Sequence, residues 1–187
     1  IGNNIKQYSF DKYDSSTDFS VQDVVLDGDV NWLLSIPGTD EIIDKSSAAD
    51  SPRLIAEGRL IGGCVDCIAK LIGTPFDGTK SFVKKYPRKI WFLDNFAMTS
   101  FDLYLTMMQM KYCGYFKGTT AIVFGRTMFG DKSDEEYIAQ LRQAITDIPF
   151  IWNADIGHVK PCFTVINGAY GRVTCAQGKG TLEQALV

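Results

Sequence analysis

The sequence predicts an α/β protein in which helices pack on a partly parallel β-sheet. Three continuous apolar runs, at 89–93, 120–124 and 150–152, are typical of strands covered on both faces. Between them, apolar residues recur at helical spacing. Asn167-Gly168 then stands between two apolar stretches, and this dipeptide is the strongest short signal for a β-hairpin. Strands that alternate with helices, followed by a hairpin, indicate a layered α/β architecture.

The elements before and around the first apolar run are predicted in order along the chain. A strand covers 54–60 and is followed by a helix over 65–72, where apolar residues follow helical spacing. Gly73 ends that helix. A short helix at 79–85 stops before Pro87, because proline cannot continue a helix, and the apolar strand follows.

The second half of the chain continues the alternation. Ser100 is the expected N-cap of a helix over 101–112, whose apolar residues mark two faces and predict deep burial. The segment 134–145 is an amphipathic helix with acidic residues in its first turn, where the helix dipole favours negative charge. The predicted hairpin joins strands at 163–166 and 169–175.

Residues 1–52 differ in composition from the rest of the chain. They are rich in Asp, Ser, Asn and Gly, with short apolar pieces at 24–26 and 32–34 but no sustained period. We expect an extended arm with one or two short strands, whose apolar pieces pack on residues 53–187 or on another domain. The first residues, 1–4, are neither an initiator methionine nor a signal peptide, which indicates a fragment of a longer protein.

Composition and charge exclude several functional classes. The 187 residues include 19 Lys and Arg against 22 Asp and Glu, for a net charge of −3. A nucleic-acid-binding protein of this size carries a basic excess, so we expect no nucleic-acid partner. With 45% hydrophobic and 22% charged residues the chain is globular. No apolar run approaches the roughly 20 residues of a membrane span, so no membrane partner is expected.

The cysteines and the single histidine limit redox and metal chemistry. The cysteine number is odd and no spacing suggests a disulfide framework, so we expect reduced thiols and a cytoplasmic location. Cys64 and Cys67 flank Asp66 at a helix start, a redox-like or zinc-like spacing. Without a second such pair, and with an acidic neighbour, structural burial is favoured. A metal site of Cys64, Cys67 and His158 is a minor alternative, and no cofactor or metal is expected. The five cysteines are Cys64, Cys67, Cys113, Cys162 and Cys175.

Two strand ends carry candidate catalytic groups. Asp94 follows the first apolar strand and His158 follows the third, whereas phosphate-binding loops and a Gly-x-Ser-x-Gly elbow are absent from the sequence. If these strands are parallel neighbours, both side chains emerge at one edge of the sheet. A carboxylate there can orient an imidazole as a general base. The alternative is that both are ordinary capping or surface groups.

Several segments also occur in a recognisable order. They are Gly58–Gly63, Leu71–Pro75, Lys89–Asn95, Gly114–Arg126 and Asp155–Pro161, and together they extend over about 57–175. This ordered set resembles the C-terminal half of the LD-carboxypeptidases, serine peptidases that include murein tetrapeptide carboxypeptidases and microcin C self-immunity proteins.

The resemblance implies a fold and a catalytic role. The fold is a three-layer swivelling β/β/α domain with a partly parallel sheet and a C-terminal hairpin. His158 becomes the general base, and Asp94 stands where the family has Glu. The nucleophilic serine belongs to a separate N-terminal domain, within a Gly-Tyr-Ser-Asp-like segment that this sequence lacks. We therefore expect residues 1–52 to be an arm or linker from that domain and 53–187 to be the C-terminal domain.

The resemblance also implies substrates and partners. The substrate is a short peptide with an L–D bond, or a peptide–nucleotide conjugate, and the full-length protein forms a homodimer without a cofactor. The 187-residue chain alone is expected to be inactive. Since Asp is one methylene shorter than Glu, we expect Asp94 to approach His158 closely without necessarily bonding to it directly. The alternative is a non-catalytic interaction domain that retains the fold.

Overall fold

The computed structural model describes residues 4–18, 20 and 23–186. They form eleven strands and four helices, and none of these helices is long and apolar enough to cross a membrane. The strands are β1 (Asn4–Tyr8), β2 (Lys12–Asp14), β3 (Leu26–Asp29), β4 (Leu33–Ser35), β5 (Ile42–Ile43), β6 (Leu54–Cys64), β7 (Lys89–Asp94), β8 (Thr119–Gly125), β9 (Phe150–Ala154), β10 (Tyr170–Ala176) and β11 (Lys179–Ala185). The helices are α1 (Val65–Leu71), α2 (Thr79–Lys85), α3 (Ser100–Tyr112) and α4 (Asp134–Ala144).

Nine of these strands form one sheet in the order β1-β11-β10-β6-β7-β8-β9-β4-β5. The four central strands, β6 to β9, are parallel, and the flanking strands pair antiparallel. The long strand β6 belongs to both parts, because Leu54–Arg59 pairs with β10 and Arg59–Cys64 pairs with β7. The remaining strands, β2 and β3, form a separate two-stranded ribbon.

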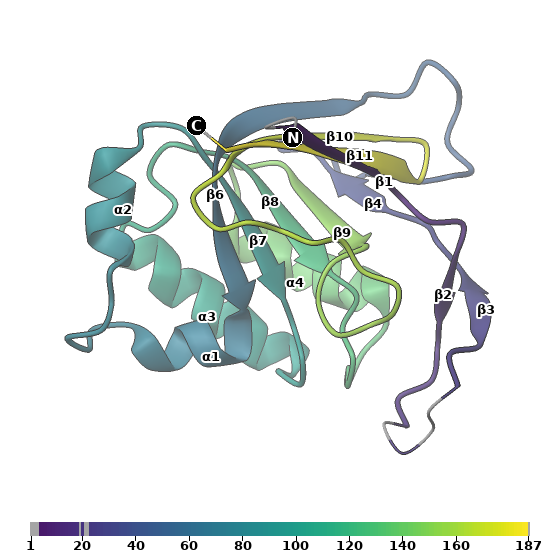
Figure 1. The fold of residues 1–187 in the computed structure, drawn as a ribbon, viewed down its shortest axis with the longest axis horizontal. Coiled ribbons are helices and arrows are strands. Elements are labelled where there is room, and N and C mark those ends of the chain that lie inside the picture. The colour runs from purple at the N-terminus through teal and green to yellow at the C-terminus, as the bar shows by residue number, and fades with distance from the viewer. Residues whose placement is uncertain (1–3, 19, 21–22, 187) are drawn as a thin grey trace.

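The parallel strands separate two hydrophobic cores. Along β7 the side chains alternate, so that Trp91 contacts the core with α1, α3 and α4, whereas Ile90 contacts the opposite core. That second core contains Trp32 together with Val173 of β10 and Leu182 of β11, and no helical residue. Figure 1 shows the helices gathered on one side of β6–β9, with β10, β11 and β1 crossing over the other. The predicted α/β fold with three β/β/α layers is confirmed.

The predicted helices agree closely with the observed ones, but the N-cap of α3 differs from the prediction. The cap of α3 is Thr99, whose backbone is extended and whose Oγ1 accepts a hydrogen bond from the N–H of Asp102 at 3.1 Å. Ser100 is instead the first helical residue, and its N–H donates to Asp131 at 2.7 Å. Two adjacent hydroxyl residues could each have capped the helix, and the prediction took the wrong one.

The Asn167-Gly168 hairpin prediction is wrong. Residues 163–166 form no strand, and Asn167 binds the backbone of Gly62 in β6, with its Oδ1 accepting at 2.9 Å and its Nδ2 donating at 3.1 Å. The C-terminal hairpin is formed by β10 and β11 around Gln177-Gly178, both with left-handed backbone (φ 47° and 75°). The side chain of Asn167 therefore serves a tertiary contact, which a local turn signal does not reveal.

The N-terminal residues contribute more structure than the one or two strands that were expected. Within the described part of 1–52 there are five strands, of which β1, β4 and β5 join the main sheet. The apolar piece at 32–34 is buried, and Trp32 is 1% exposed. The piece at 24–26, in contrast, is exposed. Only one of the two apolar pieces thus packs on the rest of the chain.

Candidate active site

The structure places His158 and Asp94 in direct contact. His158 Nδ1 meets Asp94 Oδ2, so the sequence expectation of a near approach is realised as a hydrogen-bonded pair. Asp94 is the last residue of β7 and its side chain is 7% exposed, whereas that of His158, in the loop after β9, is 42% exposed. The contact at Nδ1 turns Nε2 away from the carboxylate. The catalytic role of the pair stays a prediction.

Two glycines bring these side chains together across an intervening strand. The strands β7 and β9 are not neighbours, because β8 lies between them. The chain after β9 crosses the end of β8 at Gly125, where an added Cβ would lie 2.4 Å from the carbonyl oxygen of Ile156. It then reaches Asp94 at Gly157, which has φ +97°. A Cβ at Gly157 would lie 1.9 Å from Asp94 Oδ1, so both positions require glycine.

Burial dominates the electrostatics of Asp94. It raises the pKa of the Asp94 carboxyl above its usual value, and the neighbouring His158 partly offsets this effect. Asp94 Oδ1 is buried and has no hydrogen-bond partner among the described residues. The carboxylate of this pair is therefore shielded from water, whereas the imidazole is partly exposed.

The loop after β7 supports the imidazole from one side. The ring of Phe96 packs against that of His158, with 4.7 Å between centroids. The N–H groups of Phe96 and Ala97 both donate to the carboxylate of Asp66, at 3.0 and 3.1 Å. Asp66, at the start of α1, therefore holds the chain that follows Asp94.

A buried ion pair beneath the site was missed from the sequence. Arg126 Nη2 donates to Asp155 Oδ1 at 2.6 Å, and the Asp155 side chain is fully buried. The other carboxylate oxygen accepts from Trp32 Nε1 at 3.1 Å and from the N–H of Phe10 at 3.0 Å. Both charged residues follow the carboxyl ends of predicted strands. The rule that selected Asp94 and His158 would therefore have found them too.

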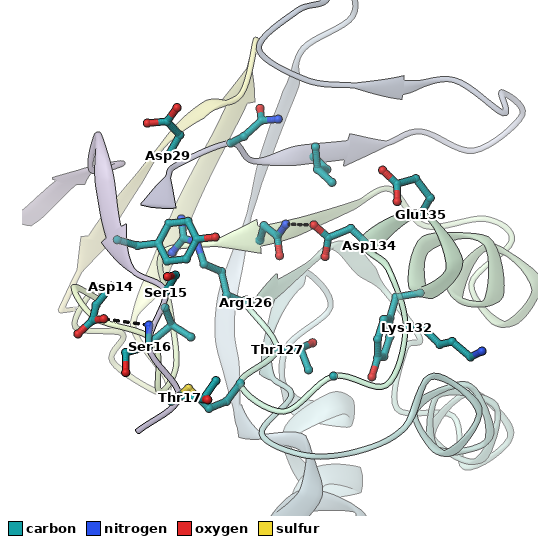
Figure 2. A pocket seen from close by; sticks show the side chains of 18 of the residues that line it. Asp14, Ser15, Ser16, Thr17, Asp29, Arg126, Thr127, Lys132, Asp134 and Glu135 are labelled. Atoms are coloured by element: carbon teal, nitrogen blue, oxygen red, sulfur yellow. Dashed lines mark hydrogen bonds between the residues drawn. The ribbon is translucent and has the colours of Figure 1, made fainter. Parts of the chain in front are cut away.

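A polar cavity of about 500 Å³ reaches the histidine loop at Val159. Figure 2 shows it between the β2–β3 ribbon and the loop after β8, with Arg126 and Thr127 along one wall and Ser15 and Ser16 along another. It shares four lining residues with a smaller cavity of about 50 Å³ that includes His158. The shared residues are Asp14, Ser16, Met128 and Val159.

The cysteines show no sign of a reactive or metal-binding site. Burial raises the pKa of Cys64 to about 11, and nearby Asp66 acts in the same direction. Among the described residues no group of three or more His, Cys, Asp or Glu could hold a metal ion, so the alternative site of Cys64, Cys67 and His158 gains no support. All five cysteines are free thiols in the structure, and their oxidation state in solution stays a prediction.

Comparisons with known proteins agree on one family. Residues 57–173, more than half of the chain, match the LD-carboxypeptidase C-terminal domain. A muramoyltetrapeptide carboxypeptidase from Oxalobacter formigenes is similar at 23% identity and a TM-score of 0.60, over 74% of this chain and 48% of that one. No curated protein matched the sequence.

Two further solved structures are similar over almost the whole chain. The microcin C7 self-immunity protein MccF, in complex with aspartyl sulfamoyl adenosine, has 15% identity and a TM-score of 0.69, over 100% of this chain and 51% of that one. An MccF-like protein from Bacillus anthracis str. Ames has 18% identity and a TM-score of 0.66, over 99% and 52%. These likenesses show the fold, and the chain spans about half the length of each protein.

Proposed function

Because this chain belongs to the LD-carboxypeptidase family, whose C-terminal domain it matches over residues 57–173, we propose that it supplies the histidine and the acid of a serine peptidase triad. The single observation that carries the proposal is the contact between His158 Nδ1 and Asp94 Oδ2 at the carboxyl edge of the parallel strands. The nucleophilic serine comes from an N-terminal domain of the same protein.

In this proposal each nitrogen of His158 has its own role, and the contact with Asp94 supports that division. Nδ1 donates its proton to Asp94, which selects the tautomer with an unprotonated Nε2. Nε2 takes the proton of the serine hydroxyl as the serine attacks the peptide carbonyl, and the acyl-enzyme forms when Nε2 returns that proton to the leaving amine. Asp94 stabilises the imidazolium during both steps, and its burial strengthens this interaction.

The alternative function is a non-catalytic interaction domain that retains the fold. Two features favour that alternative, the shorter arm of Asp94 relative to the family's Glu and the absence of the nucleophilic serine segment from this sequence. The direct contact with His158 favours the catalytic proposal, because the shorter carboxylate reaches the imidazole. Gly157 supports the same conclusion, since its missing side chain is what allows this approach.

Substrate and partners follow as further parts of the proposal. We propose a short peptide with an L–D bond, or a peptide–nucleotide conjugate, because a muramoyltetrapeptide carboxypeptidase and MccF share the fold. The polar cavity of about 500 Å³, which shares lining residues with the smaller cavity at His158, is large enough for one or two residues of such a substrate. The protein acts in the cytoplasm as a homodimer and uses no cofactor.

The test compares variants of the protein that includes the serine domain, with an L–D tetrapeptide and a peptidyl adenylate analogue as substrates. His158→Ala should abolish hydrolysis, Asp94→Asn should reduce it strongly, and Asp94→Glu should keep or raise it. The 187-residue chain alone should give no burst of product, because it lacks the activated nucleophile. Full activity of His158→Ala would refute the proposal and favour the interaction domain.

A further inference from the structure

We infer that Asp155, held by Arg126, is a positioning residue that sets the orientation of the His158 imidazole. The catalytic value of this orientation rests on the proposed function, whereas the orientation itself does not. Asp155 lies three residues before His158, and its carboxylate is hydrogen-bonded to Phe10, Trp32 and Arg126 and not to the imidazole or Asp94. It acts through the backbone of the loop that carries the histidine.

Asp155 gathers contacts from three separate parts of the chain. Its carboxylate accepts from Arg126 after β8, from the indole of Trp32 before β4 and from the N–H of Phe10 after β1. The side chain is fully buried, so each of these bonds is made away from water. Three donors that arrive from different directions leave the carboxylate, and hence the backbone of Asp155, little freedom to move.

The backbone of Asp155 closes the histidine loop. Its carbonyl oxygen accepts from the N–H of Phe163 at 2.6 Å, so the two ends of the 155–163 loop are tied together. The ring of Phe163 packs on Trp32, with 5.9 Å between centroids. Trp32 thus contacts both ends of the loop, and the loop holds Gly157 against Asp94. A displacement of Asp155 would move His158 relative to its acid.

Stability alone does not explain the ion pair. A buried Arg–Asp pair loses the hydration of two charges, and replacement of such pairs by apolar residues is often neutral or stabilising. Arg126 Nη1 is also buried without a hydrogen-bond partner among the described residues, which adds a further desolvation cost. The guanidinium lies over the ring of Tyr13, with 4.5 Å between Arg126 Cζ and the ring centroid. These features indicate a group retained for its geometry.

The test uses the single histidine of the chain as its own probe. In histidine-selective ¹⁵N-labelled protein, one set of ring signals should report His158 with a protonated, slowly exchanging Nδ1. Asp155→Asn keeps the size of the side chain but loses its charge. We expect loss of the slowly exchanging Nδ1–H signal and a shift of the ring toward mixed tautomers.

Asp134→Asn is the matched control. Asp134 also accepts from a tryptophan indole, that of Trp152 at 2.7 Å, and from the side-chain amide of Asn153 at 2.6 Å, and both partners lie in β9, before the 155–163 loop. Its Asn variant should keep the native ring signals. Trp32→Phe removes one donor to Asp155 and should cause a partial loss, and it decides the question if Asp155→Asn does not fold.

Unchanged ring signals in folded Asp155→Asn or in Trp32→Phe would overturn the inference. An equal loss in Asp134→Asn would overturn it as well, because the effect would then be one of general destabilisation. The spectra do not depend on hydrolysis. If His158→Ala stays active in the full-length protein while the spectra behave as expected, the proposed function fails and the positioning role stands.

Discussion

Replacement of Gly157 by alanine should disrupt the contact between Asp94 and His158 as well as strain the backbone. The new Cβ would lie 1.9 Å from Asp94 Oδ1 and 2.4 Å from its carboxyl carbon, well inside the roughly 3.5 Å at which carbon atoms pack. Asp94 is buried, so the loop or the carboxylate must move by more than an ångström. Alanine at φ +97° adds strain of about 1–3 kcal/mol, and the overlap adds a further ~1–3 kcal/mol.

Gly38→Ala separates the two contributions. Gly38 has a similar backbone (φ +84°), but no atom lies within 4 Å of its added Cβ, so only the strain remains. Urea unfolding of both variants should show Gly157→Ala to be the less stable by about 1–3 kcal/mol. The slowly exchanging Nδ1–H of His158 should disappear in Gly157→Ala alone. In the full-length protein, hydrolysis should fall on the order of 100-fold, as expected for a misplacement of about 1 Å. Equal stability losses with an intact Nδ1–H signal would refute the argument.

Two further predictions concern ionisation and thiol access. Burial raises the pKa of the Asp94 carboxyl above 3.8, so the folded chain holds the carboxyl proton more tightly than the unfolded chain does. Folding stability therefore falls as the pH rises from 3.8 through the raised pKa of the folded state. Asp94→Asn should therefore be more stable than the native chain at pH 7, and the difference in stability should shrink toward pH 3. Urea unfolding midpoints at both pH values measure this difference. A variant that is less stable than the native chain at pH 7 would contradict the reasoning. Iodoacetamide should modify exposed Cys67 first and Cys175 last, because Cys175 is buried with its pKa raised to about 12. Mass spectrometry of the unfolded, unreduced protein should then show five modified thiols, whereas a disulfide would leave fewer.

The sequence determined the order of the main elements. The apolar runs of β7, β8 and β9 are continuous because each strand is covered on both faces, by helices on one side and by strands on the other. That pattern is local, and so are the bounds of α2 and the capping box of α4. In this capping box the side chains of Ser133 and Glu136 each accept a hydrogen bond from the other residue's backbone N–H. The ordered segments also identified the family, which residues 57–173 match. The positions of Asp94 and His158 at strand ends followed from the same patterns.

Only the tertiary structure decided how those ends meet and what holds them. The histidine loop must cross β8, and the crossing depends on close approaches at Gly125 and Gly157 that no local pattern records. The side chain of Asn167 was available for a hairpin turn, but its bonds to β6 decided otherwise. Arg126 and Asp155 are 29 residues apart in the sequence, and Trp32 and Asp155 are 123 residues apart. Contacts at such separations form only when the chain packs into its tertiary structure, so the sequence indicated the catalytic candidates while the fold determined their geometry.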